Sequence, residues 1–217
     1  MLKFKTLSIL LCIFGIYLVA CADISKDDCT DDGCPEFVSM MEELDAEFTT
    51  ATYKVIPTIT TETKDEFVYS LNSCITHLYK DVPLDQQIPR ELIIAQAAIE
   101  TGWGKSRFAN EGNNLFGIRT WDKDDNWLLP IPWTEWPGWG VKVFETKCDS
   151  VAYYIKIINE VYAYAEFREV RAIILNEGRH PTGLDLAPTL TKYASRPNYV
   201  ELIAELIEYN IRGVYEL

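Results

Sequence analysis

The chain has 217 residues, 48% of them hydrophobic and 24% charged, which suits one globular domain with an N-terminal extension. Its formal net charge of -13 repels polyphosphate and argues against nucleic acid as a partner. The sequence contains two histidines, and it has no HExxH pair, serine-elbow motif or phosphate-binding glycine loop.

Residues 1–20 predict a signal peptide of the lipoprotein type. Two lysines precede an apolar run that ends at residue 20 and is short for a membrane span. The sequence Leu-Val-Ala-Cys resembles a lipobox, so we expect lipidation of Cys21. Ordinary cleavage after Ala22 and an uncleaved anchor are the alternatives. All three predict export, and lipidation predicts a membrane-anchored lipoprotein facing the periplasm or cell envelope.

Residues 21–60 predict a tether followed by a short helix. Positions 22–35 are acidic and poor in large apolar groups, as in a flexible tether. Apolar residues then recur at helical spacing as far as Phe48, so a helix is expected after Pro35. The threonine-rich segment 49–63 fits either a strand or an extended linker.

Four cysteines follow the lipobox, and an exported chain can oxidise them. Cys29 and Cys34 form the simplest local pair, but four cysteines allow three pairings. Cys74 lies on an apolar helical face, where it also fits an unpaired buried side chain. Together with Cys148 these positions match no common zinc-ligand spacing, so no metal site is expected.

The folded domain is expected to span residues 61–217. Apolar residues from Phe67 to Leu78 mark an amphipathic helix. A second helix is predicted between Pro89 and Gly102, because proline suits the start of a helix and glycine its end.

Glu100 is the candidate acid on this second helix. Ile93, Gln96 and Ala97 share a face with it at helical spacing, so the carboxylate is predicted to be buried and its pKa raised. A carboxylic acid that stays protonated near neutral pH can donate a proton to a leaving group. A buried structural glutamate is the alternative.

Residues 119–147 lack helical periodicity and predict a small β-lobe. The alternating sequence at 141–145 predicts a strand that pairs with residues 127–133. Helical spacing resumes afterwards, with Asp149 or Ser150 as the predicted N-cap.

The tryptophans are confined to one polar stretch of the chain, which suits a surface for flat ligands or, equally, a small aromatic core that holds an irregular lobe together. They are Trp103, Trp121, Trp127, Trp133, Trp136 and Trp139. The acidic run from Asp122 to Asp125 resembles the start of a calcium loop, but tryptophan occupies the twelfth position, so we interpret it as a solvated turn.

The central motif carries a family resemblance. The chain contains AQAAIETGWGKS followed by GNNLFGI, which resembles the bacterial N-acetylglucosaminidases of glycoside hydrolase family 73, the Bax-type branch above all. The similarity resumes in LAPTLTKYASRPNYVELIAELIEYN and covers roughly residues 62–215. It implies an α+β, lysozyme-like fold, mainly helical, with a small β-lobe flanking the active-site cleft.

The resemblance also implies an activity. The expected enzyme is an exported endo-β-N-acetylglucosaminidase that hydrolyses β-1,4 glycosidic bonds of peptidoglycan glycan strands. Its partner would be peptidoglycan or another N-acetylglucosamine-containing glycan, without nucleic acid and without any metal or organic cofactor. The protein is expected to attach to the membrane through its lipid anchor and to be a monomer.

Residue by residue, the resemblance implies that Glu100 is the general acid. Glu135, in Thr-Glu-Trp, matches the second carboxylate, with Glu145 or the substrate's own acetamide as alternatives. Asp122, Asp124 and Asp125 are further candidates behind Glu145. Tyr193 matches a tyrosine that orients the acetamide or stabilises charge, whereas Tyr199 is expected to be structural. The substrate-binding candidates are Trp103, Asn114, Phe116, Trp133 and Trp136.

Three other functions fit the sequence less well. A lytic transglycosylase also uses a single glutamate, but that class typically shows a GLMQ-like segment where this chain has NLFG. A non-catalytic glycan-binding lipoprotein would have little reason to keep Glu100. An amidase would need zinc or a cysteine with histidine, and the two histidines lack ligand spacing.

Overall fold

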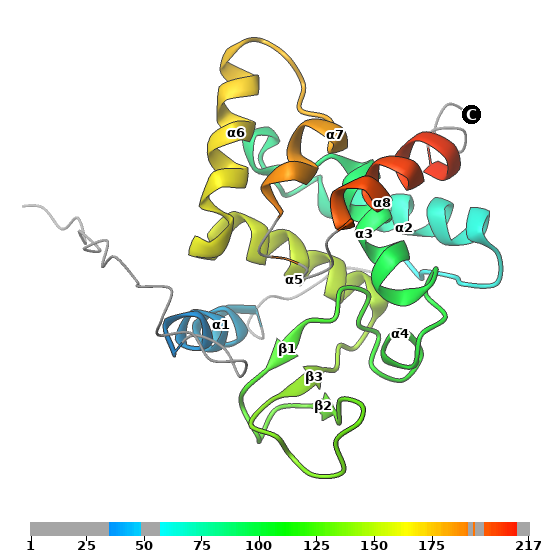
Figure 1. The fold of residues 1–217 in the computed structure, drawn as a ribbon, viewed down its shortest axis with the longest axis vertical. Coiled ribbons are helices and arrows are strands. Elements are labelled where there is room, and N and C mark those ends of the chain that lie inside the picture. The colour runs from blue at the N-terminus through cyan, green and yellow to red at the C-terminus, as the bar shows by residue number, and fades with distance from the viewer. Residues whose placement is uncertain (1–34, 49–56, 191–192, 194–197, 212–217) are drawn as a thin grey trace, which may run out of the picture.

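The computed structural model describes residues 35–48, 57–190, 193 and 198–211, and Figure 1 shows a helical body with a small β-lobe below it. The helices are α1 (Pro35–Phe48), α2 (Lys64–Leu78), α3 (Arg90–Thr101), α4 (Arg107–Glu111), α5 (Lys147–Glu160), α6 (Ala165–Asn176), α7 (Gly183–Leu186) and α8 (Tyr199–Leu206). A π-helical turn, Ile207–Ile211, continues α8. The predicted α+β fold, mainly helical with a small β-lobe, is confirmed.

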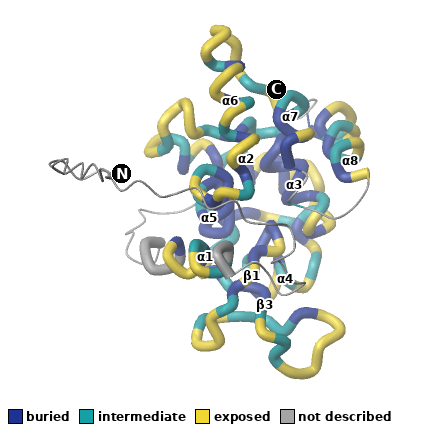
Figure 2. Tube along the Cα trace, turned by 60° about the vertical axis from the view of Figure 1, so that its left-hand side comes forward, coloured by how far each residue is buried: buried dark blue, intermediate teal, exposed yellow. Residues whose placement is uncertain are grey.

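Helix α3 lies at the centre of the helical body. It packs against α2, α7 and α8, and every residue from Leu92 to Ala98 is buried. Figure 2 shows the same concentration of buried residues around α3. Both predicted helices are confirmed: α2 buries its apolar face, and α3 begins one residue after Pro89 and ends before Gly102. Gly102 adopts a left-handed φ of 59°, which glycine reaches without strain.

The β-lobe is a three-stranded antiparallel sheet with the order β1-β3-β2. Its strands are β1 (Arg119–Thr120), β2 (Trp127–Leu128) and β3 (Gly140–Lys142). The predicted pairing of segments 127–133 and 141–145 is confirmed, since Leu128 faces Val141. The strand is shorter than predicted because the Phe144 N–H leaves the sheet and donates to the Gly112 carbonyl (2.9 Å). Strand β1 was not predicted.

Helix α5 follows the lobe and begins earlier than the sequence indicated. Thr146 is its N-cap, and its hydroxyl accepts a hydrogen bond from the Asp149 N–H (3.1 Å). Asp149 is the third helical residue of this capping box, and its carboxylate accepts from the Thr146 N–H (2.9 Å). The prediction of Asp149 or Ser150 as the cap was therefore wrong by three or four positions.

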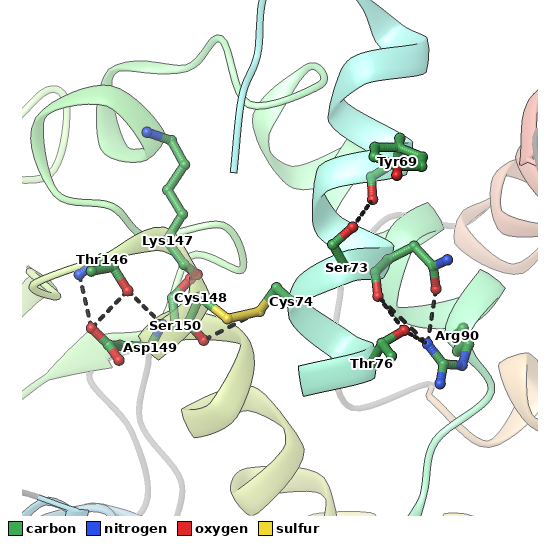
Figure 3. Close-up of a disulfide and its surroundings, with 11 residues drawn as sticks. Tyr69, Ser73, Cys74, Thr76, Arg90, Thr146, Lys147, Cys148, Asp149 and Ser150 are labelled. Atoms are coloured by element: carbon green, nitrogen blue, oxygen red, sulfur yellow. Dashed lines mark hydrogen bonds between the residues drawn. A yellow bond between two sulfur atoms is a disulfide. The ribbon is translucent and has the colours of Figure 1, made fainter. Parts of the chain in front are cut away.

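A disulfide joins Cys74 of α2 to Cys148 in the first turn of α5 (Figure 3). Cys74 is therefore not an unpaired buried side chain, as one interpretation of the sequence had it. The Cα atoms of the two cysteines lie 5.8 Å apart, a usual spacing for such a bond. Cys29 and Cys34 lie outside the described residues.

The predicted signal peptide and Cys21 also lie outside the described residues, so the boundaries 1–20, 21–60 and 61–217 stay predictions. The predicted helix after Pro35 is present as α1. Met41 and Leu44 of α1 are buried, and α1 packs against α5. Across the described ranges, no helix is both long and apolar enough to span a bilayer.

Candidate active site

Glu100 lies in the last turn of α3, where the helix leaves the core. Gln96 and Ala97, on the same face, are fully buried, but Glu100 itself is exposed. The prediction of a buried carboxylate was therefore wrong, although the next residue, Thr101, is buried. A glutamate that is exposed at the end of a buried helix is accessible to a ligand.

Three polar side chains connect Glu100 to the core. The Tyr199 hydroxyl, at the start of α8, donates to Oε1 of Glu100 (3.2 Å). Nε2 of Gln96 donates to the Tyr199 hydroxyl (3.0 Å). The Tyr154 hydroxyl, from α5, donates to Oε1 of Gln96. Helices α3, α5 and α8 therefore meet at this carboxylate.

The phenols of this cluster stay protonated at ordinary pH. Burial raises the pKa of Tyr154 and of Tyr193 well above the usual tyrosine value. Burial also raises the pKa of Tyr199, and the negative charge of Glu100 adds to that effect. Each hydroxyl is therefore available as a hydrogen-bond donor.

Tyr193 is brought close to Glu100 through the turn that follows Asn114. Its hydroxyl donates to the Phe116 carbonyl (2.9 Å), and its ring stacks on Tyr199 with centroids 6.0 Å apart. The next residue, Gly117, faces the acid: a Cβ placed there would lie 4.0 Å from Oε2 of Glu100. The structure thus unites Tyr193 and Glu100 at one site, while the catalytic role of Tyr193 stays a prediction.

Asn114 and Phe116 are placed differently from their predicted role in binding substrate. Asn114 is fully buried; its amide donates to the carbonyls of Ile118 and Lys142, and its oxygen accepts from the Phe116 and Ile118 N–H groups. The Phe116 ring is buried and stacks on Tyr154 at 4.3 Å. Both side chains are therefore enclosed in this structure, and a role for either in binding substrate, or for Asn114 in positioning Glu100, stays a prediction.

The tryptophans divide between packing and exposure. The Trp103 ring meets Phe67 of α2 edge-on at 6.2 Å, and Lys64 Nζ lies 4.8 Å from its centroid. Trp136 packs against Trp127 at 4.5 Å. Trp133 is 53% exposed on the loop between β2 and β3. Trp133 therefore fits the predicted flat surface best, whereas Trp103 is held against α2.

The contacts of the acidic residues in and beside the β-lobe do not show which of them is the second catalytic carboxylate. Glu135 is exposed on the β2–β3 loop, and Glu145 is exposed just after β3. Asp125 forms an ion pair with Lys142 (2.5 Å), and Asp122 Oδ1 accepts from the Asp124 N–H (2.8 Å). Asp122 and Asp124 are exposed, as predicted for a solvated turn, whereas the Asp125 side chain is only 23% exposed and pairs with the buried Lys142. The role of Glu135 stays a prediction.

The roles of Gln96, Tyr154 and Tyr199 were not predicted from the sequence. The sequence feature that could have indicated these roles is Gln96, a polar residue on the apolar face of α3 one turn before Glu100. Tyr199 was interpreted as structural, yet it contacts the acid directly. Among the described residues, no group of three or more His, Cys, Asp or Glu side chains is arranged to hold a metal ion.

A helical body, a small antiparallel lobe and an exposed glutamate at the end of the central helix form the lysozyme-like arrangement that the sequence predicts. The sequence model described as mannosyl-glycoprotein endo-beta-N-acetylglucosaminidase matches residues 76–212. Because this match covers more than half of the chain, the protein belongs to the glucosaminidase family.

Similar proteins include Protein bax of Escherichia coli (strain K12), which is 30% identical over 111 residues, 50% of this chain and 38% of that protein. The peptidoglycan hydrolase FlgJ of Salmonella typhimurium is 25% identical over 125 residues, 56% of this chain and 39% of that protein. The chain thus spans about two fifths of the length of these relatives. The catalytic domain of the autolysin Auto from Listeria monocytogenes shares the fold, with a TM-score of 0.51 at 18% identity over 81% of this chain and 97% of that chain.

Proposed function

We propose that this protein is an endo-β-N-acetylglucosaminidase that hydrolyses β-1,4 bonds in peptidoglycan glycan strands, with Glu100 as its general acid. The observation that supports it most is the exposed Glu100 carboxyl, held by Tyr199 at the end of a buried helix. Membership in the glucosaminidase family and the peptidoglycan hydrolases among its relatives support the substrate.

In the proposed reaction, Glu100 donates its proton to the glycosidic oxygen as the bond to the anomeric carbon breaks. The positive charge that develops on the sugar then needs a partner. Glu135 serves as a base for water or as a nucleophile; Glu145 or the substrate's acetamide are the other candidates. Tyr193 orients the acetamide or stabilises charge from beside Phe116.

The aromatic loop between β2 and β3 supplies the proposed glycan contact. Trp133 is exposed there, and Trp136 is braced by Trp127. Aromatic rings stack on the apolar faces of sugar rings, so this loop suits a neutral polymer better than an anionic one. The net charge of -13 makes such local contacts necessary, because it repels anionic wall polymers.

We further propose that the protein acts outside the cytoplasm as a monomer, anchored in the membrane by a lipid on Cys21 and facing the periplasm or cell envelope. The lysines, the apolar run and the lipobox-like sequence support this proposal. Mass spectrometry of the mature N-terminal peptide tests it. A diacylglyceryl-modified cysteine supports the anchor, and a peptide that starts at Asp23 contradicts it.

The activity is tested by digesting purified peptidoglycan and analysing borohydride-reduced products by mass spectrometry. We expect reduced N-acetylglucosamine ends with the wild type and with the exposed-glutamate control Glu62→Gln, and none with Glu100→Gln. Anhydro-muramic ends would identify a lytic transglycosylase instead. Binding without cleavage by folded wild type would identify a glycan-binding protein.

A further inference from the structure

We propose that Tyr154, Gln96 and Tyr199 form a one-way chain of hydrogen-bond donors that positions Glu100 and stabilises its carboxylate once the proton has been given to the leaving group. The three residues are positioning residues, because they act through Glu100. The catalytic consequence rests on the proposed function, whereas the effect on the Glu100 carboxyl does not.

The direction of the chain follows from the chemistry of its members. Nε2 of Gln96 can only donate, so the Tyr199 oxygen must accept from it (3.0 Å). Oε1 of Gln96 can only accept, so the Tyr154 hydroxyl must donate to it. The single proton of Tyr199 is then directed at Oε1 of Glu100 (3.2 Å). Every donor in the chain points toward the acid.

Burial makes this direction stable. Gln96 and Tyr154 are fully buried, and Tyr199 is 4% exposed. A reversed Gln96 amide would donate to the Tyr154 oxygen and would accept the Tyr199 proton, so Glu100 would lose its Tyr199 donor and the Tyr154 proton would lose Gln96 as its acceptor. With little access for water, the arrangement in which each of these protons has an acceptor is favoured.

The hydrogen-bond chain joins residues that lie far apart in the sequence. Gln96 lies one turn before Glu100 on α3, whereas Tyr154 comes from α5 and Tyr199 from α8. Other contacts add to this rigidity, since Tyr154 stacks on Phe116 at 4.3 Å. A shift of α5 or α8 relative to α3 would therefore move the Tyr199 hydroxyl away from the Glu100 carboxylate.

The ionisable groups facing Glu100 in the described part of the chain include Tyr199 from α8, Tyr154 from α5 and Tyr193. All three are neutral donors or neighbours at ordinary pH, because burial raises their pKa. A neutral donor aimed at a carboxyl group favours its charged form. Removal of the Tyr199 hydroxyl should therefore make the Glu100 carboxyl harder to ionise.

The test follows the Glu100 carboxyl directly by carbon-13 NMR of the full chain labelled at glutamate Cδ, with the resonance assigned from Glu100→Gln. In Tyr199→Phe we expect the titration midpoint of Glu100 to rise by about one pH unit. Gln96→Met should shift it the same way by less, because the Tyr199 hydroxyl is then no longer oriented. Tyr153→Phe is the matched control: it removes another buried hydroxyl of α5, one that donates to the Met41 carbonyl (3.3 Å).

A second readout is the pH dependence of cleavage. Since the general acid must be protonated, Tyr199→Phe should move the alkaline limb of kcat/KM to higher pH and lower the maximum roughly tenfold. An unchanged Glu100 midpoint in folded Tyr199→Phe, or an equal shift in Tyr153→Phe, overturns the proposal. If the midpoint shifts but the wild type cleaves no glycan, the donor chain is supported and the proposed function fails. If the wild type cleaves glycan through Glu100 but the midpoint does not shift, the proposed function is supported and the donor chain is overturned.

Discussion

Opening the disulfide between Cys74 and Cys148 is expected to lower the free energy of unfolding by about 4 kcal/mol. The two cysteines are separated by 74 positions in the sequence. In the chain-entropy treatment, a cross-link over such a loop removes roughly 15 cal/mol/K from the unfolded ensemble, or about 4 kcal/mol at room temperature. For a domain of this size, that loss lowers Tm by roughly 10 °C.

Equilibrium urea unfolding of the oxidised and reduced wild type measures this effect. Reduction breaks the cross-link without deleting a side chain, so it isolates the loop contribution. The variant with Cys74→Ala and Cys148→Ala should be at least as unstable, because both positions are buried and the smaller side chains add packing losses. This variant should also be insensitive to reductant, which controls for the remaining cysteines.

The reduced state of the wild type is verified by thiol quantification. This expectation is refuted if the oxidised and fully reduced proteins have equal free energies of unfolding. A loss confined to the double variant would refute it too, because the destabilisation would then come from packing alone.

Burial and exposure lead to three further predictions. Asn114→Ala should cost roughly 3 kcal/mol in urea unfolding, because four backbone groups each lose a hydrogen bond; a loss under about 1 kcal/mol contradicts this. Trp133→Ala should change stability by less than about 0.5 kcal/mol yet raise KM for glycan, and an unchanged KM removes Trp133 from the binding surface. Burial raises the pKa of Tyr154 and Tyr199, so the folded state holds these protons more tightly. Their contribution to stability should be constant below about pH 10 and fall above it, and a urea midpoint that does not fall above pH 10 contradicts the sign.

Much of the fold could be predicted because it depends on local patterns. The helical spacing of apolar residues located α2, and proline with glycine bounded α3 to within one residue. Alternation in one segment predicted the pairing of β2 with β3. The N-cap Thr146 was missed because Asp149 and Ser150, a few positions later, are also residues that commonly cap helices. The pairing of Cys74 with Cys148 was missed because it depends on how α2 meets α5.

The sequence by itself determined the family and the position of Glu100, the proposed acid, since the motif around Glu100 is contiguous and helical spacing places it at the end of α3. Only the tertiary structure decided its surroundings. Exposure of Glu100 depends on where α3 leaves the core, which spacing cannot show. Its donor Tyr199 is 99 positions away, and Tyr154 is 58 positions from Gln96. Such contacts form when three helices pack together, because a side-chain hydrogen bond requires atoms within about 3 Å and sequence proximity is neither necessary nor sufficient.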